Sequence, residues 1–227
     1  MAEHQEQQDG GSDGRFFDAH QRETIEAAMS RIIPSGAEPG AREAGTVDFV
    51  DRYLSGINYI YARPDGSGFE KLEGKRAQAW QHRVTILQQK YRDGIEELDR
   101  RAQRRFNAQF VALSEARQDQ VLAEMERPEL EVEESLETAR ATAAWAPSEP
   151  AMQQVSAEID LDFFPLLALH TRQGFYSDPI YGGNRDRVGW RLMGFDGPAS
   201  LAETHAGRYT TLPYFAEEPG DAAKEEK

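Results

Sequence analysis

Few side chains in this chain are of a type that could do chemistry. The histidines are His4, His20, His82, His170 and His205. No two of them share the i, i+3 or i+4 spacing that would place a pair of metal ligands on one helix face. Cysteine is absent, which excludes disulfides, zinc–thiolate sites, iron–sulfur clusters and cysteine nucleophiles from the chain. We therefore predict no catalytic residue, no metal site and no cofactor in this chain.

Other candidate chemistry lies at the end of an apolar segment. His170 would be a proton donor beside a ligand, although a hydrogen-bonded histidine at a helix terminus is the favoured interpretation. Ser177 and Asp178 suggest half of an acid–base site, but Ser-Asp-Pro is more economically a turn in which Asp178 accepts hydrogen bonds from nearby backbone N–H groups. The run from Gly182 to Asn184 resembles a phosphate loop, yet it lacks the lysine of that motif and follows no strand. None of these amounts to a convincing active site.

The run from Gly174 to Gly194 is better explained as a docking surface. It holds five glycines and four aromatics in 21 residues, GFYSDPIYGGNRDRVGWRLMG. Dense glycine permits positive φ and close backbone approach, and aromatic rings supply contact area on a rigid frame. The aromatics could equally line a small-molecule pocket or cover the core, and the sequence leaves open whether Trp190 is core or interface. The predicted partner-binding residues are Phe175, Tyr176, Asp178, Pro179, Tyr181, Gly182, Gly183, Asn184 and Trp190.

The elements that must position this surface are helices. Asp18 and Gln21 form a capping-box pattern ahead of an apolar face that ends at Pro34. A second helix is predicted over about 46–61. The third and longest has the apolar stripe Trp80 to Leu98, where Gly94 weakens the helix and favours a kink.

Two further helices follow. One is predicted over about 115–126, and another from Met152, with a kink at Pro165 and with Gly174 as the residue that follows its end. Between them, residues 129–150 are interpreted as a partly ordered acidic connection in which Trp145 is an anchor. A short helix is predicted over 188–193.

These patterns predict an all-α fold of about five or six helices. We expect a single helical domain over residues 16–197, between a disordered tail at 1–15 and an extended acidic tail at 198–227. The net charge of −14 argues against binding to nucleic acid or to an anionic membrane surface. No apolar run approaches the roughly 20 residues that span a bilayer.

Residues 1–14 contain no basic residue and no apolar run, so they match neither a secretory nor a twin-arginine signal. From the sequence as written we expect a cytoplasmic protein. A partner that carries the signal would instead place the complex in the periplasm or outside the cell.

Several short runs together resemble one known family. Those in the C-terminal part are Gly174-Phe175-Tyr176-Ser177-Asp178-Pro179, Tyr181-Gly182-Gly183-Asn184, Gly189-Trp190 and Gly194-Phe195. Those in the N-terminal part are Ile32-Ile33-Pro34, Pro39-Gly40-Ala41 and the segment from Val47 to Leu54. This pattern, over roughly residues 16–197, is similar to the gluconate 2-dehydrogenase subunit 3 family.

The resemblance implies an accessory small subunit without cofactor or catalytic residues. Its partner would be a large FAD-containing oxidoreductase of the glucose-methanol-choline (GMC) type that oxidises a sugar, glycoside or sugar acid, and a cytochrome c subunit would pass the electrons on. The small subunit would support folding, stability or export of the large one.

Two alternatives remain open at this point. The first is a stand-alone enzyme acting on a sugar, with a pocket around Tyr176, His170, Asp178 and Asn184. The second is a transient assembly factor that is absent from the mature oxidoreductase.

Overall fold

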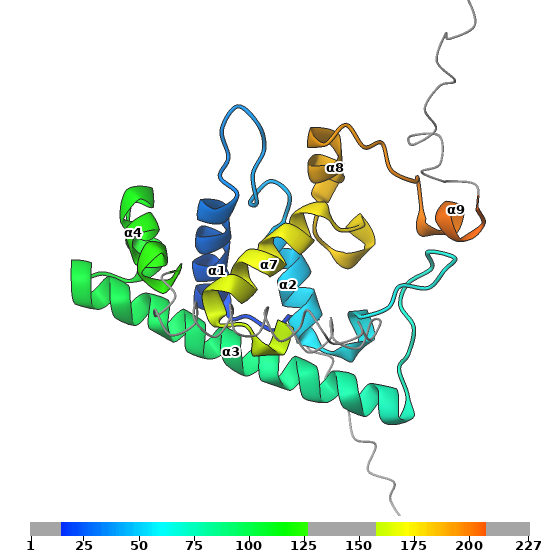
Figure 1. Ribbon diagram of the computed structural model, residues 1–227, viewed down its shortest axis with the longest axis horizontal. Helices are drawn as coiled ribbons and strands as arrows, with labels where there is room; N and C mark the ends of the chain where they lie inside the picture. The colour runs from blue at the N-terminus through cyan, green and yellow to red at the C-terminus, as the bar shows by residue number, and fades with distance from the viewer. Residues whose placement is uncertain (1–14, 127–157, 208–227) are drawn as a thin grey trace, which may run out of the picture.

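A computed structural model describes residues 15–126 and 158–207 of the chain (Figure 1). The described α-helices are α1 (Ala19–Ile32), α2 (Thr46–Ser55), α3 (Gly74–Phe106), α4 (Glu115–Glu126), α7 (Phe163–Tyr176), α8 (Val188–Leu192) and α9 (Leu201–His205). Within these ranges there is no strand, only an isolated antiparallel bridge between Ala62 and Phe69. The all-α prediction is therefore confirmed, with five helices of ten residues or more and two short ones in the described part.

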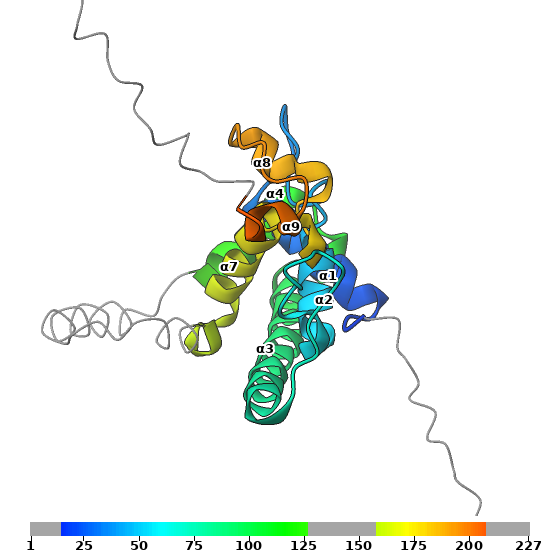
Figure 2. The same ribbon diagram turned by 90° about the vertical axis from the view of Figure 1, so that its right-hand side faces the viewer.

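The helix α3 is the base on which the others are arranged. Figure 1 shows it running along the molecule, with α1, α2 and α7 on one side and α4 folded back over its C-terminal end. Figure 2, turned by 90°, shows α2 close to α3, with α7 to their left. One apolar core joins these helices through fully buried side chains such as Ile25, Val50, Leu87, Val121 and Leu166.

The first and fourth helices match the sequence prediction closely. The Asp18 carboxylate accepts a hydrogen bond from the Gln21 N–H at 2.8 Å, and the Gln21 side chain accepts one from the Asp18 N–H at 3.2 Å. This reciprocal capping box satisfies two N–H groups that the helix itself leaves without partners. α4 has the predicted limits, Glu115–Glu126.

Glycine ends α2 earlier than predicted. The helix stops at Ser55, because Gly56 takes φ of 154°, and a 3-10 turn over Ile57–Tyr59 follows. Only a residue without Cβ adopts that φ readily. The predicted helix over 46–61 is thus two shorter elements.

Gly94 serves close packing in a continuous α3. A Cβ at this position would lie 2.2 Å from the ring of Phe163. The expected kink was wrong as an explanation of this glycine, since α3 is one helix from Gly74 to Phe106 and the missing side chain makes room for Phe163.

The limits predicted for the last major helix need correction. α7 begins at Phe163, so Pro165 lies in its first turn, where a missing N–H leaves no helical hydrogen bond unmade. It ends at Tyr176, so His170 and Gly174 lie inside it and not at its end. The predicted start at Met152, the 129–150 connection with Trp145, and residues 1–14 and 208–227 of the tails lie outside the described residues.

Two short helices complete the described chain. The predicted helix over 188–193 is present as α8, while α9 was not expected and lies within the predicted 198–227 tail, with no buried residue. Among the described helices, none is long and apolar enough to cross a membrane.

Candidate functional site

The loop that follows α7 folds back onto the helix at three glycines, Gly174, Gly183 and Gly189, which we call the glycine seat. A Cβ at Gly183 would lie 2.1 Å from the Gly174 oxygen, and one at Gly189 would lie 2.0 Å from the Phe175 oxygen. The Asn184 N–H donates to the Gly174 oxygen at 2.7 Å. The loop and helix backbones therefore touch directly, which side chains at Gly183 and Gly189 would prevent. A Cβ at Gly174 would instead lie 3.1 Å from the Thr46 oxygen of α2.

Asn184 fixes the loop from within. Its buried amide group donates to the Ser177 oxygen at 2.9 Å and accepts from the Gly189 N–H at 2.8 Å. Its backbone has φ of 47°, and Asp186 and Arg187 also have positive φ. Three non-glycine residues in this conformation so close together cost free energy, and the surrounding contacts must compensate for it.

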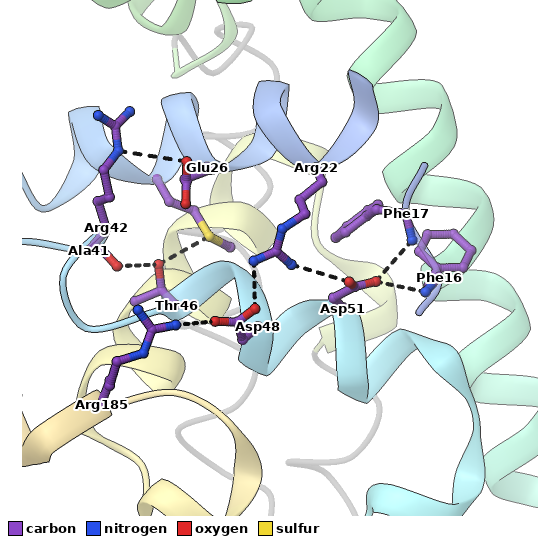
Figure 3. Close-up of polar contacts among 11 residues, drawn as sticks. Phe16, Phe17, Arg22, Glu26, Ala41, Arg42, Thr46, Asp48, Asp51 and Arg185 are labelled. Carbon is purple, nitrogen blue, oxygen red and sulfur yellow. Dashed lines mark hydrogen bonds and ion pairs between the residues drawn. The ribbon is translucent and has the colours of Figure 1, made fainter. Parts of the chain in front are cut away.

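The loop is also tied to α2. The guanidinium of Arg185 donates to Asp48 at 2.6 Å, and Arg22 of α1 contacts the other oxygen of Asp48 at 2.5 Å (Figure 3). Asp51, one turn further along α2, accepts the N–H groups of Phe16 and Phe17 at 2.7 and 2.9 Å. α2 is thus the element to which both the start of the chain's described part and the glycine-rich loop are attached.

The structure divides the nine predicted partner-binding residues into two groups. The buried ones are Phe175, Gly183, Asn184 and Trp190. The exposed or half-buried ones are Tyr176, Asp178, Pro179, Tyr181 and Gly182. The first group supports the loop from behind, and only the second group has surface available for contact with a partner.

Trp190 belongs to the interior of this chain. It is 6% exposed, its indole N–H donates to the Tyr176 oxygen at 2.8 Å, and its ring packs edge-on against Phe195. The exposed large apolar side chains nearby in sequence are instead Tyr176, Leu192 and Met193, at 43%, 41% and 56% exposure. The exposure of Leu192 and Met193 was not predicted, because aliphatic residues at the end of a short helix give no local signal of whether they face the core or the solvent.

An aromatic pocket of about 590 Å³ lies beside Tyr176, between α2, the 57–59 turn, α3 and α7. Five tyrosines line it, namely Tyr53, Tyr59, Tyr61, Tyr176 and Tyr181. Phe49 and Trp80 add two further rings. Of the four loop aromatics, Tyr176 and Tyr181 line the pocket, as one sequence-based alternative predicted, whereas Phe175 and Trp190 are buried in the chain.

A chain of buried polar groups, which we call the polar chain, runs from the pocket into the core. The carboxylate of Glu158 pairs with Arg83 at the pocket and contacts His170 Nε2 at 2.5 Å. His170 Nδ1 lies 2.8 Å from the hydroxyl of Tyr91. The hydroxyl of Tyr53 donates to Glu158 at 3.4 Å.

Burial determines the protonation states of the residues in the polar chain. Desolvation, with Arg83 adding to it, lowers the pKa of His170 from 6.5 to about 3. A neutral imidazole fits both contacts, with Nε2–H donating to Glu158 and Nδ1 accepting from Tyr91. Burial also raises the pKa of Tyr53 and, more strongly, that of Tyr91, which keeps both hydroxyls protonated.

The residues of the stand-alone enzyme hypothesis are not brought together. His170 is fully buried in the polar chain, and Asn184 is occupied within the loop. Asp178 accepts the N–H of Ile180 at 2.9 Å, as the turn interpretation predicted. No hydrogen bond joins these three side chains in the described part of the structure, and no cluster of potential metal ligands occurs among the described residues.

Comparisons with known proteins identify the family. The family model for gluconate 2-dehydrogenase subunit 3 matches residues 19–197, which is most of the chain. Searches of curated proteins and of solved structures gave no match. The matched residues extend from the start of α1 to just beyond α8 and include the glycine seat. The chain belongs to the gluconate 2-dehydrogenase subunit 3 family.

Proposed function

We propose that this chain is the non-catalytic small subunit of an oxidoreductase complex, and that it binds and stabilises a large FAD-dependent subunit of the GMC type. The large subunit would bind the FAD and oxidise a sugar, glycoside or sugar acid. A cytochrome c subunit would accept the electrons. The family match over residues 19–197 carries this proposal, because the matched family is a dehydrogenase subunit.

The geometry of the glycine-rich loop supports a docking role. The glycine seat and the Asn184 hydrogen bonds hold the loop in one conformation before any partner arrives. A surface that is already ordered loses less conformational entropy on association. Tyr176 stands at the edge of this loop with 43% of its surface exposed, which suits an aromatic interface contact.

Isolation of the chain with its partners tests the proposal. The chain is purified from its native host by affinity capture, and the absorption spectrum of the captured material is recorded. A yellow complex with flavin absorbance, one large partner and sugar-dependent dye reduction is the expected result. A colourless chain captured alone would overturn the proposal.

A single substitution then locates the interface. Tyr176→Ala should weaken association by about 1 to 2 kcal/mol while leaving the melting temperature of the free chain nearly unchanged. Gln109→Ala, an exposed change in the connection between α3 and α4, is the matched control and should alter neither property. Equal affinities for the two variants would show that the partner binds elsewhere.

A further inference from the structure

The aromatic pocket has the features of a small-molecule binding site. Its volume of about 590 Å³ falls within the roughly 300–1,000 Å³ of small-molecule sites. Such sites combine apolar and aromatic walls with a few convergent polar groups, and they coincide with titratable groups whose pKa values are displaced. Arg83 and Glu158 converge at this pocket, and burial raises the pKa of Tyr53, which also lines it, so both features are found together here.

The walls of the pocket present rings in several orientations. Tyr61 meets Trp80 edge-on, at 5.7 Å between ring centroids and 85° between planes. Phe49 and Tyr53 are stacked, at 6.2 Å and 24°. A flat ring entering the pocket can therefore make both offset-stacked and edge-to-face contacts, the two arrangements that aromatic pairs prefer.

The charges of the pocket determine the charge of its ligand. Its two charged lining residues, Arg83 and Glu158, form an ion pair with each other, and their side chains are only 10% and 9% exposed. A charged ligand would lose its hydration without meeting an opposite charge that is not already paired. Gln173, which is exposed at the pocket, and the tyrosine hydroxyls are suited to a neutral hydroxyl or carbonyl group.

From these observations we propose that the aromatic pocket binds a neutral planar aromatic molecule that carries a hydroxyl or carbonyl group. The ring lies among the tyrosines and Trp80, and its polar group is directed to the Gln173 side of the pocket. All residues of this site belong to the small subunit, so the site does not depend on the identity of the large subunit.

The test uses the full chain and a matched pair of probes. 2-Naphthol is the planar probe, and decahydro-2-naphthol has the same carbon skeleton and hydroxyl without aromaticity. Binding is measured by calorimetry, and the site is read from the indole N–H resonance of Trp80, assigned with Trp80→Phe. We expect 2-naphthol to bind about tenfold more tightly than the saturated probe, because aromatic pairs contribute beyond area burial.

Substitutions at the pocket complete the test. Tyr176→Ala should weaken 2-naphthol binding several-fold, whereas Met193→Ala, which removes an exposed aliphatic side chain outside the pocket, should leave it unchanged. A shift of the Trp80 resonance supports the assignment. Equal affinity for the two probes, an unshifted Trp80 resonance or no binding of 2-naphthol would each overturn it. The flavin-complex experiment has a separate readout, so failure here leaves the subunit role intact.

Discussion

The C-terminal end and the middle of α7 are held by different kinds of contact. At its C-terminal end, the glycine seat brings loop and helix backbones together, and the contact depends on the absence of side chains at Gly183 and Gly189, while Gly174 makes room for Thr46 of α2. In its middle, His170 joins the polar chain that reaches Arg83 on α3, and the contact depends on charge and protonation. The first contact should therefore tolerate no added atom, while the second should tolerate a change of size better than a change of charge or pH.

The largest effect should come from adding one methyl group to the glycine seat. Gly189→Ala places a Cβ 2.0 Å from the Phe175 oxygen, and the backbone must move to relieve the overlap. We expect the free energy of unfolding to fall by about 3 kcal/mol, at the upper end of the usual cost of overpacking. Urea unfolding measures this change. Gly36→Ala is the control, since nothing lies within 4 Å of its added Cβ. Equal stability of the two variants would refute the steric explanation.

A charge change in the polar chain should have the next largest effect. Glu158→Gln keeps the size of the side chain but removes the negative charge that faces Arg83 and His170. The expected loss is about 2 kcal/mol, since both members of the ion pair are nearly buried. Glu124→Gln removes a charge from a more exposed pair with Arg105 and should cost no more than about 0.5 kcal/mol. Similar losses would mean that burial adds nothing to the first pair.

The protonation of His170 should make stability depend on pH. In the folded chain its pKa is lowered to about 3, while the unfolded chain retains a value near 6.5. Between these values the unfolded state binds the proton and the folded state does not, so stability is lost as the pH falls below 6.5. We expect a loss of about 1 kcal/mol between pH 7 and pH 5.5. His170→Gln should lose this dependence, and His82→Gln, an exposed control, should keep it.

The helices could be predicted where local patterns determine them. α1 has a capping box and a repeating apolar face, and α4 has the same kind of repeat before Pro128. The error at α7 had a physical reason. The local pattern predicts Gly174 as the residue after a helix end, which is a common position for glycine, but in the structure Gly174 makes close contact with Thr46 and with the loop. Contacts between distant segments decide such cases, and the sequence alone does not show them.

The candidate site was predicted only in part, because some of its contacts also join distant segments of the sequence. The loop residues form one continuous run, so their role as a unit was visible, whereas the ion pair of Arg83 and Glu158 joins residues 75 positions apart. One signal was nevertheless present. Arg83 lies three residues after Trp80 and next to Val84, on the apolar stripe of α3, where a charged residue is rarely buried without a partner.

The smallest effect should come from the solvent-exposed ion pair that connects the loop to α2. Arg185 is 56% exposed and pairs with Asp48, which Arg22 also contacts (Figure 3). At physiological salt such a pair contributes little, so Arg185→Ala should lower the free energy of unfolding by no more than about 0.5 kcal/mol. Arg42→Ala, at 58% exposure and 3.7 Å from Glu26, is the matched control and should behave alike.

This comparison bears on what fixes the loop. If the glycine seat holds it, removal of the Arg185 side chain leaves the backbone contact with Gly174 in place, and unfolding in low and high salt should give nearly the same small loss. A loss of about 2 kcal/mol that disappears in high salt would mean instead that electrostatic attraction to α2 positions the loop. The docking surface would then be ordered by charge, and its affinity for a partner would fall with ionic strength even without charged residues at the interface.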